Sequence, residues 1–454
     1  MKRLISLSFV ICHLSFTPAG AQTAWTMQQC MQYAIEHHHA VKQAELELDN
    51  HKAARTGAIG RFMPAVSANI GGQYNFGRAI DPETNLYTDV STFNNGYSLQ
   101  ASLPVFDGFS RIHALRAAKA SQLMGQSVLW QRQNQTALDV LHAYANAVYY
   151  EGLVLMAGEK VKETDLLLRL TSLLEETGRK SAADVAQVQS QKAEADYELA
   201  QQQNLLSSAL LELKKTMAFP LSKELRVESA GFATGVVPPA GMTVASSCQP
   251  TAASERSTSA SPSTLHSSLL TARYQMQVSK HEWRQARAAL FPSLSLSAGL
   301  NTTYYHTLHA DAGQSFRTQF KNNMGEYVGA TLSIPLFNRL QTITSIRRAR
   351  NNYRIARENY EQQQLELEKL SREAWQDWQA YQKQSEQMTK KVEADSIAYQ
   401  LTRRQFEEGL STAIDLHTTS AQLLKSKATL LQCQLMVIVK EHLVRYYRGE
   451  TIWE

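Results

Sequence analysis

An internal duplication constrains this chain more than any other feature of its sequence. A glycine followed six positions later by an aspartate occurs twice, as Gly178 with Asp184 and as Gly409 with Asp415, and the two copies stand 231 residues apart. The same offset aligns five further pairs, namely Phe106 with Phe337, Arg116 with Arg347, Ala118 with Ala349, Tyr144 with Trp375 and Tyr150 with Tyr381. An offset kept over so many positions indicates two copies of one supersecondary unit.

The duplication divides the chain into four expected parts. A basic pair, the apolar run LISLSFVIC and an AGA site predict a signal peptide over residues 1–21. The first repeat is expected at 22–220 and the second at 265–454, and a Pro/Ser/Thr-rich linker at 221–264 joins them. Each repeat is predicted to contain a helix, a β-hairpin and a long helical hairpin, with the opening helices at 26–60 and 266–290.

Alternation with a period of two predicts the strands. Apolar residues alternate with serine, asparagine, glutamine and glycine in four segments, at 66–76, 97–105, 294–300 and 328–336. Tyrosine and phenylalanine stand near the segment ends, as is typical of transmembrane β-strands. A pair of half-buried hairpins on a soluble domain is the alternative interpretation.

Four strands cannot close a barrel on their own. The smallest membrane-spanning barrels need about eight strands, and open sheet edges are not tolerated in lipid. If these strands span a membrane, several chains must share one barrel. Two chains would supply eight strands and three chains would supply twelve.

Two very long helices are predicted at 108–174 and 339–405, where the sequence has no proline and little glycine. Some 65 residues at ~1.5 Å each make a rod of roughly 100 Å. Apolar residues recur with a seven-residue spacing in two seams, Tyr353, Tyr360, Leu367, Ala374, Tyr381 and Met388 in the second helix and Leu141, Val148 and Leu155 in the first. Such heptads predict left-handed supercoiling against partner helices.

The duplicated turn has a clear structural interpretation. Each glycine suits the left-handed position that ends a helix. Ser181 and Thr412 are natural N-caps of the helices that follow. Asp184 and Asp415 then stand at the third helical position, where they complete a capping pattern and complement the helix dipole.

Several classes of site are excluded. The histidines at 37–39 would point about 100° apart on a helix and could not converge on one metal ion. No nucleophile–base pair, phosphate-binding loop or zinc spacing is present, so we expect neither an enzyme nor a cofactor. The net charge of +5 is spread among mixed signs, which argues against a nucleic-acid partner.

The sequence resembles the outer-membrane efflux protein family, the TolC-like channels of tripartite efflux and type I secretion systems. The resemblance covers essentially the whole mature chain. It rests on the opening WTMQQCMQYAIEHHHAVKQAELELDNHKAARTGAIGRFMPAVSAN, on the segments LPVFDG and IPLFNR, and on the two glycine–aspartate turns.

The resemblance implies a mainly α protein with β structure. The expected assembly is a homotrimer in which a coiled-coil helical barrel continues a 12-strand transmembrane β-barrel, with four strands from each chain. It would lie in the outer membrane of a Gram-negative bacterium, in contact with its lipid, and extend into the periplasm. The helical tip would dock on a periplasmic adaptor, and through it on an inner-membrane RND or ABC transporter.

The resemblance also implies roles for residues at the turns. Asp184 and Asp415 become candidates for a gate or selectivity ring in addition to their capping role. The alternative is that they only cap the helices. The candidate adaptor-docking residues are Gly178, Arg179, Gly409 and Leu410. In the family an apolar residue commonly follows the tip glycine. The second tip has Leu410 at this position, whereas the first tip has Arg179, so the two tips differ.

The function that follows is a passive outer-membrane exit duct whose periplasmic tip is opened by the adaptor. Two alternatives belong to other classes. One is a structural coiled-coil protein of the cell envelope, and the other is a stand-alone outer-membrane porin.

Overall fold

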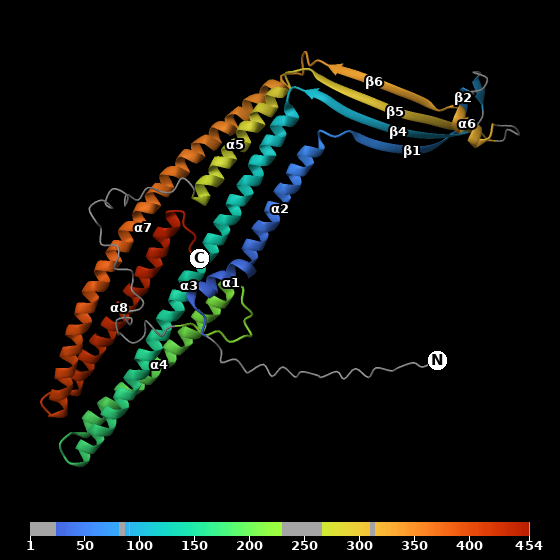
Figure 1. Cartoon of the computed structure of the whole chain (residues 1–454). Helices are drawn as coiled ribbons and strands as arrows, with labels where there is room; N and C mark the ends of the chain where they lie inside the picture. Colours follow the sequence, from blue (N-terminus) through green and yellow to red (C-terminus); the bar gives the residue numbers. More distant parts are fainter. Residues whose placement is uncertain (1–23, 81–86, 90, 229–265, 309–313, 454) are drawn as a thin grey trace, which may run out of the picture.

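The computed structural model describes residues 24–80, 87–89, 91–228, 266–308 and 314–453, so the expected signal peptide and most of the expected linker lie outside it. The molecule is elongated, with a long helical body that meets a sheet at a bend (Figure 1). The helices are α1 Met27–His37, α2 His39–Gly60, α3 Ser110–Glu176, α4 Ala182–Thr216, α5 Ser267–Ala288, α6 Phe316–Asn322, α7 Gln341–Glu407 and α8 Ala413–Tyr447. The strands are β1 Ala65–Asn75, β2 Arg78–Ile80, β3 Tyr87–Asp89, β4 Thr92–Asp107, β5 Ser293–Thr307 and β6 Gly325–Ser333.

The duplication predicted from the sequence is confirmed in the helix boundaries. Helices α3 and α7 each have 67 residues, α4 and α8 each have 35, and both pairs are related by the 231-residue offset. The corner before each long helix also repeats, with positive φ at Gly108 (65°) and Arg339 (55°). At Gly108 a Cβ atom would lie 2.5 Å from the Ala288 carbonyl oxygen, so this corner requires glycine.

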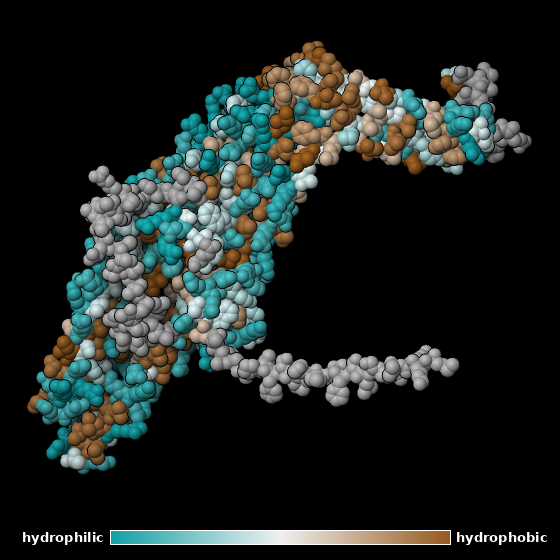
Figure 2. Space-filling model, viewed as in Figure 1, coloured by the Kyte–Doolittle hydropathy of each residue, from teal (hydrophilic) through white to brown (hydrophobic). Residues whose placement is uncertain are grey.

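The four predicted strand segments form one antiparallel sheet in the order β1–β4–β5–β6. The two repeats join at the β4–β5 pair, and β1 and β6 are the edge strands. Side chains alternate between a small-polar face and an apolar face, as predicted. Apolar side chains remain exposed on the single chain, including Ile70 at 74% and Val328 at 86%, and hydrophobic residues gather over the sheet and the neighbouring bend (Figure 2).

The helical body has its core at mid-length, where α1, α3, α4 and α8 meet. Cys30, Leu141, Val148 and Leu213 are fully buried there. The Tyr144 hydroxyl donates to the carbonyls of Trp25 and Glu228, each at 3.1 Å. The buried side chains of Leu225 and Val227 belong to this core too, so the start of the segment expected as linker packs with the first repeat.

One predicted seam is confirmed and the other is wrong at its end. Leu367 and Ala374 are buried and the other four members of the α7 seam are half-buried. Leu155 on α3, however, is 49% exposed. At this point Gly152 takes the close contact with α8, where a Cβ atom would come 2.4 Å from Leu431 Cδ2. A straight helix drifts by about 20° per heptad against a seven-residue repeat, which moves Leu155 off the seam.

The opening helix predicted over 26–60 is two helices. His38 has an extended backbone (φ −67°, ψ 134°), and its Nδ1 accepts a hydrogen bond from the Ala40 N–H at 3.2 Å, which caps α2. His37 instead stacks on Tyr33 with ring centroids 4.1 Å apart. Neighbouring histidines thus have separate local roles, and the described residues contain no His/Cys/Asp/Glu group that could hold a metal ion.

In the part of the chain that the structure describes, no helix is both long and apolar enough to cross a membrane.

Candidate functional site

The end of the helical body farthest from the sheet carries both duplicated turns (Figure 1). The α3–α4 turn and the α7–α8 turn have the same backbone. Gly178 and Gly409 have φ of 71° and 78°, and nothing lies within 4 Å of a Cβ built on either. The N–H groups of Arg179 and Leu410 reach back five residues to carbonyls of the preceding helix, at 2.8 and 2.7 Å. This is the Schellman ending, which satisfies carbonyls that the helix leaves unpaired.

A capping box begins the helix after each turn. In the first, the Ser181 hydroxyl accepts from the Asp184 N–H at 3.2 Å, and Asp184 Oδ2 accepts from the Ser181 N–H at 2.9 Å and from its hydroxyl at 2.8 Å. In the second, Thr412 and Asp415 make the same three bonds at 3.2, 3.1 and 2.6 Å. Each carboxylate therefore has a structural role within its own turn.

These hydrogen bonds keep both aspartates charged. Bonds from the Ser181 backbone and hydroxyl lower the pKa of Asp184, and bonds from the Thr412 hydroxyl and backbone lower the pKa of Asp415. Both side chains remain accessible to solvent. The chain brings the two carboxylates to the same end of the body, where they add fixed negative charge near neutral pH.

A small apolar cluster, which we call the tip cluster, joins the two helical hairpins just above the turns. Its buried members are Val188, Phe406, Ala413 and Leu416, packed against Leu167, Leu168 and Tyr399. Because these residues come from α3, α4, α7 and α8, the cluster holds one hairpin against the other. Phe406 is 1% exposed and is the largest fully buried side chain of the described chain.

Two polar contacts reinforce the tip cluster. Lys180 Nζ, from the first turn, lies 4.8 Å from the centroid of the Phe406 ring, a cation–π contact between the hairpins. Gln191 on α4 donates its side-chain amide to the Ala413 carbonyl at 3.4 Å. The difference between the two turn sequences thus has a structural use, since Lys180 reaches across to the other hairpin. Arg179 and Leu410 remain exposed, Leu410 by 76%.

Glu163 of α3 lies on the same interface, farther from the turns, and was not a candidate in the sequence analysis. Burial raises its pKa, while the charges of Arg403, Lys427 and Lys160 and a hydrogen bond from Ser420 oppose that rise. Arg403 belongs to α7, and Ser420 and Lys427 belong to α8, so Glu163 is a second link between the hairpins. Nothing in the local sequence distinguishes Glu163 from the many solvated glutamates of these helices.

Comparisons with known proteins agree on one family. The model of the family described as "Outer membrane efflux protein" matches residues 30–218 and 265–442. The relatives include the probable efflux pump outer membrane protein TtgC and the antibiotic efflux pump outer membrane protein ArpC of Pseudomonas putida. Each is 22% identical over 449 residues, which are 93% of this chain and 84% of the relative.

Solved structures show the same fold. The outer membrane protein VceC of Vibrio cholerae is 13% identical, with a TM-score of 0.77 over 94% of this chain and 96% of that one. CusC is 16% identical, with a TM-score of 0.75 over 94% and 92%. The CmeC outer membrane channel of Campylobacter jejuni is 14% identical, with a TM-score of 0.74 over 93% and 85%.

Proposed function

Since this chain belongs to the outer membrane efflux protein family, we propose that it is the exit duct of a tripartite efflux or type I secretion system. The family consists of efflux conduits and not of enzymes, and we assign the chain no catalytic role. Its place is the outer membrane. The observation that carries the proposal is a four-stranded sheet with an exposed apolar face, joined to a helical body of 67-residue helices.

The sheet supports a trimeric barrel. Its edge strands β1 and β6 each have one strand partner within the described sheet, so each has one unpaired edge. In lipid those edges must pair, and β6 of one chain beside β1 of the next closes a barrel without any edge. Three chains give twelve strands, with the apolar face toward lipid and the small-polar face toward the channel.

The helical body extends the duct into the periplasm. Helices α2, α3, α5 and α7 lie side by side and leave the sheet at one end (Figure 1). A helix of 67 residues spans about 100 Å. Three copies of this layer form a tube whose far end carries six turns, two from each chain.

The turns are the proposed docking site for a periplasmic adaptor, which connects the duct to an inner-membrane transporter of the RND or ABC class. The second turn offers an apolar contact through the exposed Leu410, and the first offers a cationic contact through Arg179. We propose that the two turns bind different parts of the adaptor surface. The duct is passive, and the choice of exported compound lies with the transporter.

The tip cluster is the proposed closed-state latch. It holds both hairpins of a chain together, and adaptor binding would stabilise an arrangement in which they separate. In the closed trimer the carboxylates of Asp184 and Asp415 gather around the opening. A ring of carboxylates favours cations and resists anions.

The test is isolation of the protein from native envelopes. We expect a heat-sensitive trimer in the outer-membrane fraction and co-purification of an adaptor after cross-linking. A soluble monomer in the periplasm would contradict the proposal and favour a structural coiled-coil protein. A trimer that supports diffusion in cells lacking every adaptor would favour a stand-alone porin.

A further inference from the structure

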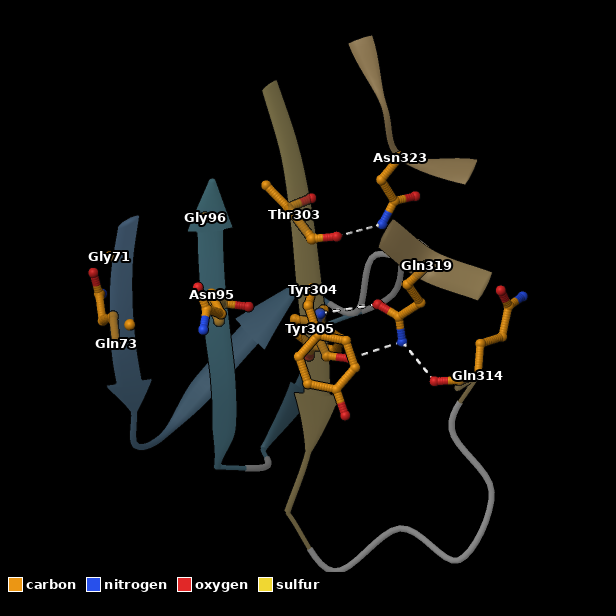
Figure 3. Close-up of a pocket in the computed structure, with 12 residues that line it drawn as sticks. Gly71, Gln73, Asn95, Gly96, Thr303, Tyr304, Tyr305, Gln314, Gln319 and Asn323 are labelled. Atoms are coloured by element: carbon orange, nitrogen blue, oxygen red, sulfur yellow. Dashed lines mark hydrogen bonds between the residues drawn. The ribbon is translucent and has the colours of Figure 1, made fainter. Parts of the chain in front are cut away.

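A cavity of about 620 Å³ lies at the end of the sheet that is farthest from the long helical body. Strands β1, β4 and β5 form its floor, and residues of the α6 segment, Gln314, Gln319 and Asn323, form one wall (Figure 3). Its size falls within the range of ordinary small-molecule sites. The tip and the latch lie at the opposite end of the molecule, so this cavity is a separate site.

Two glycines create the hollow. Gly71 on β1 pairs with Gly96 on β4, and Gly96 pairs with Thr303 on β5. Nothing lies within 4 Å of a Cβ built on either glycine. Residues directly opposite one another in an antiparallel sheet share a face, and one step of two residues adds Gln73, Asn94 and Tyr305 to it. The small-polar face of the sheet is therefore hollowed here, with polar side chains around the hollow.

The wall is fixed by hydrogen bonds that replace a missing strand. Strand β6 begins at Gly325, opposite Asn301, so the last part of β5 is paired with β4 on one side and has no strand on the β6 side. Gln319 fills that place, because its side chain accepts from the Tyr305 N–H and donates to the Tyr305 carbonyl, each at 2.9 Å. Asn323 donates to the Thr303 carbonyl at 2.8 Å (Figure 3). These hydrogen bonds fix the wall in place before any ligand binds.

The lining is uncharged and rich in amides. Among the described residues that line the cavity, none is Asp, Glu, Lys or Arg. Within this described lining, Asn95 Oδ1 and the Tyr305 hydroxyl are buried without a hydrogen-bond partner, and the amides of Asn94 and Gln314 also line the cavity. Amides offer both donors and acceptors, which suits neighbouring hydroxyl groups of a ligand. An ion would lose its hydration here without gaining an opposite charge.

We propose that this cavity binds a neutral saccharide, with one sugar ring over Gly71 and Gly96 and its hydroxyls hydrogen-bonded to Asn94 and Gln314. The unpartnered Tyr305 hydroxyl is a further polar group of the same site. That the site faces the outer mouth of the channel rests on the proposed function, whereas the cavity itself is formed by one chain. The saccharide is either an exported soluble sugar or a glycan of the cell surface.

The experiment uses the purified full-length protein in a detergent without a sugar headgroup. Binding of maltotriose and of an uncharged O-antigen oligosaccharide is measured by saturation-transfer NMR and calorimetry, with an equally sized anionic oligosaccharide for comparison. We expect the neutral sugars to bind and the anionic one to bind at least about tenfold more weakly. Stronger binding of maltotriose than of the O-antigen oligosaccharide favours a soluble sugar, and the reverse favours a surface glycan.

Two variants test the site. Gly96→Leu fills the hollow and should abolish binding, and Asn94→Ala should weaken it about tenfold, as expected for the loss of one or two hydrogen bonds. Tyr74→Phe on the opposite face of the same sheet is the matched control and should bind as the parent does. Asn94→Ala leaves the backbone pairing intact, so it answers the question even if Gly96→Leu fails to assemble.

Absence of neutral-sugar binding to a correctly assembled trimer would overturn this inference and leave the proposed duct function intact. Equal binding by the parent, Gly96→Leu and Asn94→Ala would overturn it as well, because the sugar would then bind elsewhere. Failure of the protein to form a trimer would count against the proposed function. If a single chain bound the sugar and the binding depended on Asn94, the proposed saccharide site would still be supported.

Discussion

Replacing Phe406 with alanine should open the periplasmic tip without unfolding the protein. Its ring is 1% exposed and is the central aromatic group of the tip cluster. Truncating a fully buried phenylalanine costs about 3–5 kcal/mol, and the lost contact with Lys180 adds roughly 0.5–1 kcal/mol. The tip cluster has four buried residues and is separate from the mid-length core, so the loss stays local.

The size of the effect follows from these values. If the tip cluster holds the closed state, a loss of about 3 kcal/mol moves the closed–open equilibrium by roughly a hundredfold, because each 1.4 kcal/mol is a factor of ten. Phe406→Leu keeps most of the apolar volume and should shift the equilibrium by about tenfold or less. The two variants together therefore predict a graded response.

The assay is single-channel recording of the purified trimer in planar bilayers. Phe406→Ala should show long, high-conductance openings, Phe406→Leu should show rarer ones, and the parent should stay mostly closed. Leu410→Ala is the matched control, since Leu410 lies at the same tip, is 76% exposed and belongs to no cluster. Thermal unfolding of the trimer should stay within a few degrees of the parent.

A closed channel in an intact Phe406→Ala trimer would refute the latch. A large fall in trimer melting temperature would show instead that the tip cluster supports the whole fold. If Leu410→Ala opened the channel as strongly, the effect would come from any change at the tip and not from the buried ring.

Three further predictions concern the same end of the molecule. Replacing Asp184 and Asp415 with asparagine should lower the cation preference of the trimer in single-channel recordings, whereas unchanged selectivity would leave them as helix caps only. Burial raises the pKa of Glu163. Its contribution to the stability of the closed tip is therefore complete at pH values below the ordinary pKa of glutamate, and it is lost as the pH rises through the raised pKa. Channel opening should increase over that pH range, and Glu163→Gln should remove this pH dependence. In adaptor-capture assays Leu410→Ala should weaken binding by about tenfold at both low and high salt, while the effect of Arg179→Ala should disappear at high salt because exposed charges are screened.

Local sequence patterns predicted those parts of the tip that are formed by neighbouring residues. Each glycine needs a left-handed backbone, and each Ser or Thr cap bonds an N–H only three positions away, so a short stretch of sequence holds all the information. The same holds for the period-two strands. The prediction for Leu155 was wrong, because the α3 residues that meet α8 are selected by packing against a helix nearly three hundred residues away in sequence, as at Gly152 and Leu431.

The sequence by itself determined the duplicated unit, the length of the long helices, the alternating faces of the sheet and the capped turns. These follow from residue spacing and backbone chemistry, which act within a few positions. Only the tertiary structure decided that Phe406, Lys180 and Glu163 face the other hairpin, and that paired glycines leave a hollow beside α6. The partners in those contacts lie far apart in the chain, and packing brings them together, so no local pattern could identify them.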